Sequence, residues 1–237
     1  MIDENPFPRR VNDDPVKAPT GLTPQPVILT GRQVRLEPLD LERHIGALYR
    51  IGHESETARQ SWAYLPWGPF SDEAAYLELM QKLSRIEGNA FFAICDAVSG
   101  AVVGMAAYWD SQPVFGVTEI AAVWFAPAFQ RTPGATEAMF LMLAYAMDEL
   151  GYRRVQWRCN AMNAKSRSAA KRLGFRFEGI FFGNMVSKGR NRDTAWYSIL
   201  DSEWPGLKST IEAWLDPSNL EVEGKQLQSL SVMTAPR

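Results

Sequence analysis

The chain has 237 residues, of which 46% are hydrophobic and 22% are charged, which is ordinary for a globular protein with a substantial core. Its 25 basic and 27 acidic residues leave a formal net charge of −2, without the basic excess that attracts nucleic acid or anionic membranes. No stretch reaches the roughly 20 apolar residues of a membrane span, and the N-terminus lacks the apolar core of a signal peptide. We therefore expect a cytoplasmic protein with no nucleic-acid partner and no membrane partner.

Three regions of the chain differ in composition. Residues 1–28 carry prolines among polar residues, which bury too little apolar surface to offset their ordering entropy, so we expect an extended arm. Residues 29–203 carry the periodic apolar pattern of the predicted domain, and residues 204–237 read as a short helix followed by a polar tail. Cys95 and Cys159 lie far apart within apolar runs, so we expect buried, reduced thiols and no metal site.

Apolar periodicity and turn residues predict a mixed sheet flanked by helices. The predicted elements are a strand at 34–39, helices at 41–51 and 71–83, strands at 91–95, 102–109 and 118–125, a helix at 134–150, a strand at 155–159, a helix at 163–173 and hairpin strands at 177–187 and 194–200. In the helix at 134–150 the apolar residues recur at three- and four-residue steps and predict one buried stripe. His44 and His53 lie on or after the first helix, where we expect surface positions.

Residues 119–150 predict a strand that runs through a short loop directly into an amphipathic helix. The loop ends in Gln130-Arg131-Thr132-Pro133-Gly134-Ala135. Backbone N–H groups at a helix start lack intrahelical partners, and the helix dipole adds positive charge, so this turn could bind a phosphate. Thr132 as N-cap and Pro133 at the first helical position would equally begin a helix that binds nothing. The spacing alone does not decide between these interpretations.

This loop resembles the pyrophosphate loop of the GNAT superfamily of N-acetyltransferases, Q/R-x-x-G-x-G/A, with Gln130 in the first position and Ala135 in the last. Pro133 stands where the family has its first glycine, which removes one amide donor, and Gly134 would permit close approach of a ligand instead. The resemblance implies acetyl-CoA as co-substrate and no metal. It implies cofactor contacts from Gln130, Arg131, Thr132, Pro133, Gly134, Ala135 and Thr136.

A second segment, from Asn163 to Phe175, resembles another GNAT landmark, N-x-x-A/S followed by L-G-F. Ser166 and Ala170 share one face of this helix, and the resemblance implies that Asn163, Ser166 and Ala170 form a wall of the acetyl-CoA channel. Close packing on the sheet is the alternative. Many GNAT enzymes have a tyrosine at the Ala170 position that protonates the departing thiolate. RimL-like enzymes resemble this chain in carrying serine at the Ser166 position, so the general-acid role passes to Ser166.

The two motifs together imply the GNAT fold over residues 32–201, in the RimJ/RimL-like branch. We expect an α/β protein whose central sheet is mixed, mostly antiparallel, seven-stranded and flanked by helices. The fourth and fifth strands, at 118–125 and 155–159, are expected to splay apart. The resemblance implies that backbone amides of Val123, Trp124 and Phe125 beside this splay contact the cofactor and stabilise the oxyanion.

Acetyl transfer to an amine also needs a base, because an alkylammonium is only about one part in a thousand neutral at pH 7. Glu119 lies on the predicted fourth strand, where it alternates with Ala121, Val123 and Phe125, and Glu178 follows the second motif. Either carboxylate could be catalytic, and either could instead be solvated or ion-paired.

The acceptor side is predicted from residues 59–70, a proline-containing loop with four aromatic residues. In RimJ/RimL-like proteins this region borders the acceptor pocket, which implies substrate contacts from Trp62, Tyr64 and Trp67. A small satellite core under a long loop is the alternative. The basic turn at 188–193 would suit an acidic substrate, but we favour an exposed turn that is basic for solubility.

The resemblance predicts an N-acetyltransferase that moves an acetyl group from acetyl-CoA to a primary amine by direct attack. The acceptor is a peptide N-terminus or a small-molecule amine, and a homodimer is left open. The alternative is a non-catalytic acyl-CoA-binding or interaction module on the same scaffold, which Pro133 and the missing tyrosine favour. A nucleotide-phosphate enzyme is disfavoured, because the chain has no G-x-x-x-x-G-K-[ST] and no strand-associated G-x-G-x-x-G.

Overall fold

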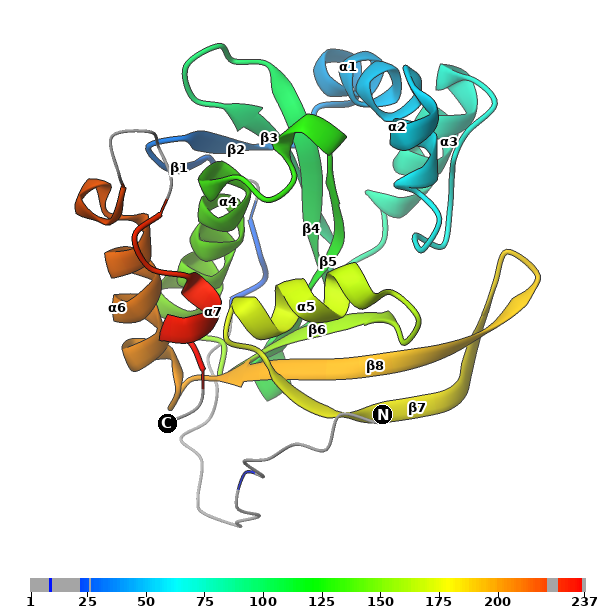
Figure 1. Cartoon of the computed structure of the whole chain (residues 1–237). Coiled ribbons are helices and arrows are strands. Elements are labelled where there is room, and N and C mark those ends of the chain that lie inside the picture. Colours follow the sequence, from blue (N-terminus) through cyan, green and yellow to red (C-terminus); the bar gives the residue numbers. More distant parts are fainter. Residues whose placement is uncertain (1–8, 10–21, 26, 221–225, 236–237) are drawn as a thin grey trace.

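An eight-stranded sheet runs through the computed structural model, which describes residues 9, 22–25, 27–220 and 226–235 (Figure 1). The strands lie in the order β1-β2-β3-β4-β5-β6-β8-β7, and only β5 and β6 pair in parallel. They are β1 (Leu29–Thr30), β2 (Val34–Pro38), β3 (Ala90–Asp96), β4 (Val102–Gln112), β5 (Val117–Phe125), β6 (Arg154–Asn160), β7 (Arg176–Ser187) and β8 (Arg190–Leu200).

Helices cover both faces of this sheet (Figure 1). Those on one face are α1 (Leu41–His53), α2 (Glu56–Gln60) and α3 (Glu73–Leu83). Those on the other face are α4 (Pro133–Ala144), α5 (Ala164–Arg172), α6 (Trp204–Leu215) and α7 (Leu230–Met233). A π-helical turn, Tyr145–Glu149, extends α4.

The predicted fold class is confirmed, as a mostly antiparallel mixed sheet with flanking helices. The structure adds an eighth strand, β1, whose two residues are too few to produce a periodic signal. It also adds α2 and α7, which have five and four residues and are likewise too short to show a helical apolar period. Each predicted strand and helix has a counterpart at nearly the predicted place.

The sheet separates two hydrophobic cores. Alternating residues of β3 divide between them, so that Phe92 joins the main core under α4 and Phe91 joins a second core under α1–α3. The predicted stripe on the helix at 134–150 is confirmed, since all of its apolar members are buried in the main core. They are Met139, Met142, Leu143, Ala146, Met147 and Leu150.

The predicted splay of the fourth and fifth strands corresponds to β5 and β6. These strands pair only over Val117–Glu119 and Arg154–Gln156. Beyond Glu119, β5 remains paired with β4 alone, and β6 remains paired with β8 alone. The sheet therefore opens between β5 and β6 toward the carboxyl ends of both strands.

A β-bulge lies in β5 at this opening. Met105 pairs with Trp124 and Ala107 with Ala121, so Ala122 and Val123 together face one residue of β4, and Ala122 has a left-handed φ of 51°. The bulge overturns the expected alternation, because it moves Val123 and Phe125 to the face opposite Glu119. Trp124 packs with α1–α3 on the face that Glu119 shares.

Both predictions for the histidines are wrong, because His44 and His53 are buried. The Nδ1 of His44 accepts the Asp40 N–H at 3.0 Å. The Nε2 of His53 accepts the Phe70 N–H at 2.8 Å and its Nδ1 lies 2.7 Å from the Tyr49 carbonyl oxygen. Burial lowers the pKa of both imidazoles, so they serve as neutral packing residues. Both cysteines are free and buried, as expected.

The C-terminal region packs onto the domain rather than trailing from it. Trp214 of α6 and Leu230 of α7 are buried in the main core, and the Trp214 indole N–H donates to the Gln228 carbonyl at 2.9 Å. The predicted arm at 1–28 lies outside the described residues except for residues 9, 22–25, 27 and 28. Within the described ranges, none of the helices combines the length and apolarity needed to cross a bilayer.

Candidate active site

Two helix N-termini stand at the open end of the splayed strands. β5 runs through residues 126–132 into α4, and β6 runs through residues 161–163 into α5. Because β5 and β6 are parallel, both helices begin at the end where the strands part. Unpaired N–H groups and helix dipoles from two sides therefore face the same opening, which favours an anionic ligand there.

The loop into α4 is built as the sequence predicts. Thr132 caps the helix, its Oγ1 accepting the Ala135 N–H at 3.2 Å, and Pro133 occupies the first helical position. Arg131 has a left-handed φ of 66°, and the Gln130 side chain donates to the Phe125 carbonyl at 3.1 Å. Pro133 has no N–H and that of Ala135 is engaged, so the first-turn amide left for a ligand is that of Gly134.

Gly134 is explained by the protein's own packing. A Cβ there would lie 2.6 Å from the Phe129 Cζ, so the glycine admits the Phe129 ring against the first turn of α4. The expected role of Gly134 was close approach of a ligand. In this structure the group that occupies the space beside Gly134 is the Phe129 ring.

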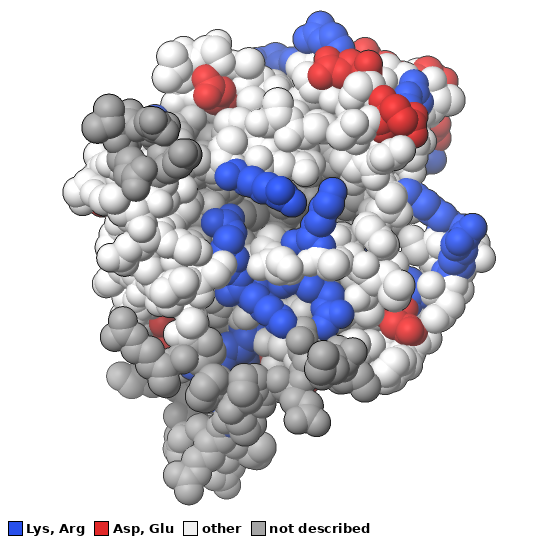
Figure 2. Space-filling model, viewed as in Figure 1, with Lys and Arg blue, Asp and Glu red and all other residues white. Residues whose placement is uncertain are grey.

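Basic side chains gather around α5 and the beginning of α4. Figure 2 shows them on the face that carries α4, α5 and α7, with the acidic side chains toward the rim of that view. The basic residues that α5 contributes are Lys165, Arg167, Lys171 and Arg172. Arg172 donates to the hydroxyl of buried Thr136 at 2.8 Å and thereby ties the end of α5 to α4. Such a surface attracts a polyanion such as a nucleotide diphosphate.

The start of α5 brings Ser166 beside β6. The Asn163 side chain caps the helix by accepting the Ser166 N–H at 3.1 Å. The Ser166 Oγ accepts the indole N–H of Trp157 at 3.0 Å, which leaves its hydroxyl hydrogen able to donate. Ala170, expected to contact the cofactor, is fully buried in the main core.

Glu119 lies at the point where β5 and β6 part, on the face of the sheet that α1–α3 share. Its carboxylate accepts the Arg158 Nε at 2.5 Å and also contacts Arg158 Nη2. Only 5% of Glu119 is exposed. Burial raises the pKa of the Glu119 carboxyl, although Arg158 opposes the shift. A shielded carboxylate with a raised pKa beside an opening is a suitable general base.

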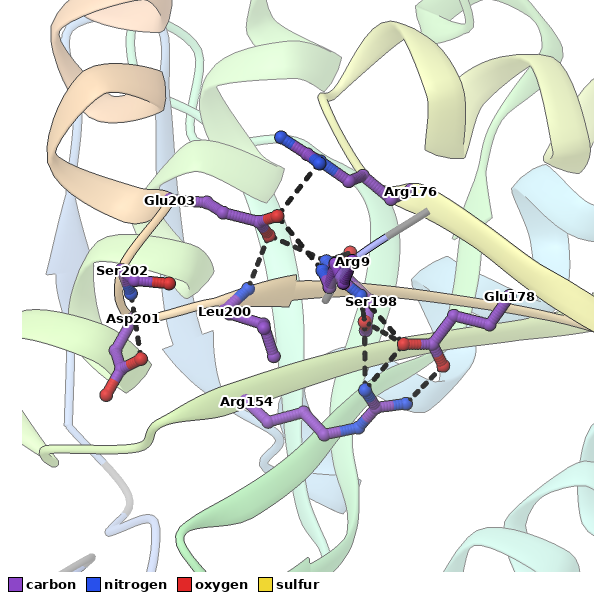
Figure 3. A network of polar contacts seen from close by, with 9 residues as sticks. All are labelled: Arg9, Arg154, Arg176, Glu178, Ser198, Leu200, Asp201, Ser202 and Glu203. Carbon is purple, nitrogen blue, oxygen red and sulfur yellow. Dashed lines mark hydrogen bonds and ion pairs between the residues drawn. The ribbon is translucent and has the colours of Figure 1, made fainter. Parts of the chain in front are cut away.

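Glu178, the other predicted base, lies in a network of ion pairs at the paired end of the strands (Figure 3). It accepts from Arg154 at 2.7 Å, from Arg9 at 2.8 Å and from Ser198 at 2.6 Å. Burial alone would raise the pKa of Glu178, but the hydrogen bonds from Arg154 and Ser198 and the charges of Arg154 and Arg9 lower it. A carboxylate held this way is a weak base, so the geometry favours Glu119.

The aromatic loop divides into core and surface residues. Trp62 is fully buried, donates to the Gly52 carbonyl at 2.9 Å and stacks on Trp124 at 5.1 Å between ring centroids. This position matches the satellite-core alternative and gives Trp62 no surface for an acceptor. Trp67 lies 6.1 Å from the Trp109 ring, and Tyr64 is 43% exposed. Tyr64 and Trp67 thus remain the acceptor-contact candidates of this loop.

The tip of the β7–β8 hairpin reaches this loop. Lys188 donates from Nζ to the Trp62 carbonyl at 2.9 Å. One residue of the basic turn, Lys188, thus contacts the aromatic loop. The hairpin tip is thereby joined to the core under α1–α3, on the face of the sheet that carries Glu119 and Arg158.

A cluster with metal-ligating atom types exists elsewhere, formed by Glu37, His44 and Cys95, whose ligand atoms lie within 4.8 Å of one another. The Nδ1 of His44 accepts a backbone N–H, so in the neutral ring its Nε2 carries the proton and has no lone pair for a metal. Glu37 is also paired with Arg35 and Arg43. We interpret the cluster as a hydrogen-bonded part of the fold.

Three residues on the Glu119 side of the sheet were missed from the sequence: Arg158, Arg192 and Trp196. Arg158 and Trp196 are cross-strand partners of β6 and β8, and the Arg158 guanidinium lies 4.9 Å from the Trp196 ring centroid. The alternating arginines at 190 and 192 were a signal, but they were interpreted as a soluble turn. Their orientation depends on the β6–β8 register, which local patterns do not reveal.

Comparison with known proteins agrees with this geometry. Residues 33–176 match the family model described as an acetyltransferase (GNAT) domain. The protein named "Putative ribosomal N-acetyltransferase YdaF" of Bacillus subtilis is 28% identical over 181 residues, which cover 73% of this chain and 92% of that protein. A crystal structure of a GCN5-related N-acetyltransferase from Brucella melitensis has a TM-score of 0.87 at 44% identity, covering 92% of this chain and 98% of that one.

A solved structure of RimL, a ribosomal L7/L12 alpha-N-protein acetyltransferase, has a TM-score of 0.63 at 18% identity, covering 73% of this chain and 94% of that one, which shows the fold alone. The family match spans more than half of the chain, from β2 through α5, and includes both splayed strands and the helices that follow them. The chain therefore belongs to the GNAT acetyltransferase family, and it is an acyltransferase.

Proposed function

We propose that this enzyme transfers the acetyl group of acetyl-CoA to a primary amine by direct attack of the amine on the thioester. The observation that supports this most is the parting of β5 and β6 after three paired residues, beside the bulge at Ala122. Glu119 lies on one face of that opening and Ser166 on the other. An amine and a thioester that meet in the gap would have a base and a hydrogen-bond donor on opposite sides.

The pyrophosphate of acetyl-CoA would lie at the first turn of α4. The Gly134 N–H, the loop amides of Arg131 and Thr132, and the basic surface around α5 support this position. Pro133 supplies no N–H there, so the positive surface carries more of the binding than it would with a glycine at this position. Backbone amides beside Val123, re-aimed by the bulge, would donate to the thioester oxygen.

The amine attacks the thioester carbonyl carbon, the new C–N bond forms and the C–S bond breaks. The proton lost by the amine goes to Glu119, directly or through one water. Ser166 donates its hydroxyl hydrogen toward the departing sulfur, and solvent restores that hydrogen. The products are an acetamide and the free thiol of coenzyme A.

The acceptor class is supported by relatives and by the residues near Glu119; we call the space that the acceptor would occupy beside Glu119, Arg158 and Arg192 the chamber. YdaF carries a name that refers to ribosomal substrates, which favours a peptide or protein N-terminus and a cytoplasmic setting. A small amine is the other acceptor that a chamber rimmed by Tyr64, Trp67 and the β7–β8 tip would admit.

A non-catalytic module that binds acyl-CoA is the second candidate. Pro133 in the loop and Phe129 against Gly134 are the observations that favour it, because both reduce the amide surface open to a diphosphate. Calorimetry with acetyl-CoA, followed by a thiol-release assay over a panel of amines and N-terminal peptides, separates the two candidates. Binding with turnover on at least one amine supports the enzyme. Binding without turnover on any acceptor supports the module.

A homodimer is the remaining part of the proposal. The outer half of β7, an edge strand, supports it by exposing apolar side chains. They are Phe181, Phe182, Met185 and Val186. Sedimentation of the wild type and of Phe182→Ser tests it. A wild-type dimer that dissociates in the variant is the expected result, and a wild-type monomer contradicts it.

A further inference from the structure

One face of β8 carries a row of polar side chains on the side of the sheet where Glu119 lies. Arg192, Thr194, Trp196 and Ser198 alternate along the strand and so share a face. Trp196 pairs across from Arg158, which binds Glu119, so this face is the one on which Glu119 lies. Ala195 and Tyr197, on the other face, belong to the main core.

Three members of this row have buried polar atoms without hydrogen-bond partners in the described part of the chain. They are the Nε of Arg192, the Oγ1 of Thr194 and the Nε1 of Trp196. Buried polar groups in native proteins are nearly always paired, since an unpaired one costs stability. Ser198, at the other end of the row, is fully engaged by Arg9, Arg154 and Glu178. Unpaired donors thus concentrate at the Arg192 end.

Arg192 differs from its neighbour Arg158 in the partners of its side chain. Arg158 is committed to Glu119 and lies over the Trp196 ring. Arg192 has no carboxylate partner among the described residues, although the charge of Glu119 is near enough to raise its pKa. Burial, the largest influence, lowers the pKa of Arg192, and a guanidinium keeps its positive charge at neutral pH. This side of the sheet therefore carries the buried carboxylate of Glu119, the exposed carboxylate of Asp110 at 3.6 Å from Arg158, and one cation, Arg192, without a carboxylate partner among the described residues.

Resting on the proposed function, we propose that Arg192 binds an anionic group of the acceptor, so that the preferred substrates are primary amines that also carry a carboxylate. The ammonium end of such a molecule faces Glu119, where it loses its proton. The carboxylate faces Arg192, a planar donor that suits bidentate carboxylate binding. The Trp196 indole N–H and the Thr194 hydroxyl donate hydrogen bonds to the other lone pairs of the substrate carboxylate.

The same charges act against polyamines. A second ammonium group in place of the carboxylate would lie beside Arg158 and Arg192, and like charges in a shielded chamber repel. The carboxylate has two sources, a free amino acid or a peptide whose N-terminal region includes an acidic side chain. Both present the same chemistry to Arg192, and the substrate panel distinguishes them.

The panel compares amines that differ only in the carboxylate: phenylalanine with phenethylamine, lysine with cadaverine, and the peptide amides Ala-Asp-Ala and Ala-Asn-Ala. For the wild type we expect kcat/KM to be about tenfold or more higher for the carboxylated member of the productive pair. A preference within the amino-acid pairs identifies a free amino acid, and a preference within the peptide pair identifies an N-terminus. Equal values within every pair would overturn the proposal.

Arg192→Met removes the charge and keeps the length of the side chain. We expect it to raise the acceptor KM more than it lowers kcat, and to reduce the preference within the productive pair by about tenfold. Arg192→Lys should restore part of that preference. Arg190→Met, on the exposed end of the same hairpin, is the matched control and should keep the wild-type ratio. A ratio that Arg192→Met leaves unchanged contradicts the assignment.

Failure of the acetyltransferase proposal can be distinguished from failure of the Arg192 anion site. If the wild type acetylates nothing in the panel, calorimetry still tests Arg192. The two ligands compared are N-acetylphenylalanine and N-acetylphenethylamine, each titrated in the presence of coenzyme A. Binding of the acid alone, lost in Arg192→Met, supports the anion site. Equal binding of both compounds, or of neither, overturns it.

Discussion

Glu119 and Glu178 lie on the same face of one sheet, each bonded to an arginine of β6, yet their surroundings differ. Glu178 accepts hydrogen bonds from two cations, Arg9 and Arg154, and from the Ser198 hydroxyl, and its pKa is lowered. Glu119 has Arg158 as its donor, is more deeply buried, and its pKa is raised. The comparison shows that an arginine partner does not by itself decide the direction in which the pKa of a carboxyl group shifts.

Position along the splay explains the difference. Arg154, the partner of Glu178, begins β6 where the strands are still paired, and the surrounding groups satisfy one another there. Arg158 lies beyond the last pair, beside an opening where donors of β8 are unpaired. The polar groups at the closed end are paired with one another, and the open end is where unpaired polar groups would be available to the proposed acceptor.

The strongest test of this comparison is Glu119→Gln. We expect it to lower kcat/KM by about a hundredfold or more, because it removes the base and keeps the shape of the side chain. For the wild type, kcat/KM should fall as the pH drops through the raised pKa of Glu119, since only the ionised form accepts the proton. Turnover against pH checks both points. A variant that keeps both wild-type turnover and the acidic limb would assign the base elsewhere.

A smaller effect is expected on the opposite side of the gap. Ser166→Ala should lower turnover by about tenfold while calorimetry shows unchanged acetyl-CoA binding, because the hydroxyl acts on the departing sulfur. Ser168→Ala, an exposed serine on the same helix, is the matched control. Unchanged turnover in Ser166→Ala would remove this residue from the mechanism.

Glu178→Gln should affect stability rather than catalysis. Breaking its charged hydrogen bonds should lower the free energy of unfolding by about 2 kcal/mol at neutral pH. Because the folded pKa of Glu178 is lowered, this contribution is full above its unfolded pKa and is lost as the pH falls through the folded value. Denaturant titrations at neutral and acidic pH measure it. A large loss of turnover without loss of stability would make Glu178, not Glu119, the reactive carboxylate.

The smallest effect concerns the rim of the chamber. Lys188→Met removes the bond from the hairpin tip to the Trp62 carbonyl, and we expect the acceptor KM to rise about threefold with kcat retained. Steady-state kinetics with the best acceptor checks this. If only the melting temperature changes, the contact made by the hairpin tip stabilises the fold and is not part of the acceptor site.

Local signals predicted what is local in this fold. Thr132 and Pro133 begin α4, Asn163 begins α5, and the apolar stripe that follows Gly134 is buried, all as their neighbours in sequence indicate. The candidate cofactor loop could therefore be located from the sequence alone. The faces of β5 could not be predicted from strand alternation. The bulge requires a left-handed φ at Ala122, and no sequence pattern indicates that conformation for an alanine.

Non-local contacts account for what the sequence did not reveal. The burial of His53 depends on the aromatic loop folding back over α1, through the Phe70 N–H. The pairing of Glu119 with Arg158, and the unpaired state of Arg192, depend on the register of β6 with β5 and β8. The distinction between the two glutamates is thus a property of tertiary packing.

A structure of the complex with coenzyme A tests the central claim most directly. The account predicts the diphosphate at the first turn of α4 and the sulfur in the gap between β5 and β6, within hydrogen-bonding reach of the Ser166 hydroxyl. Coenzyme A bound elsewhere, or a gap filled by the protein's own side chains in the complex, would contradict it.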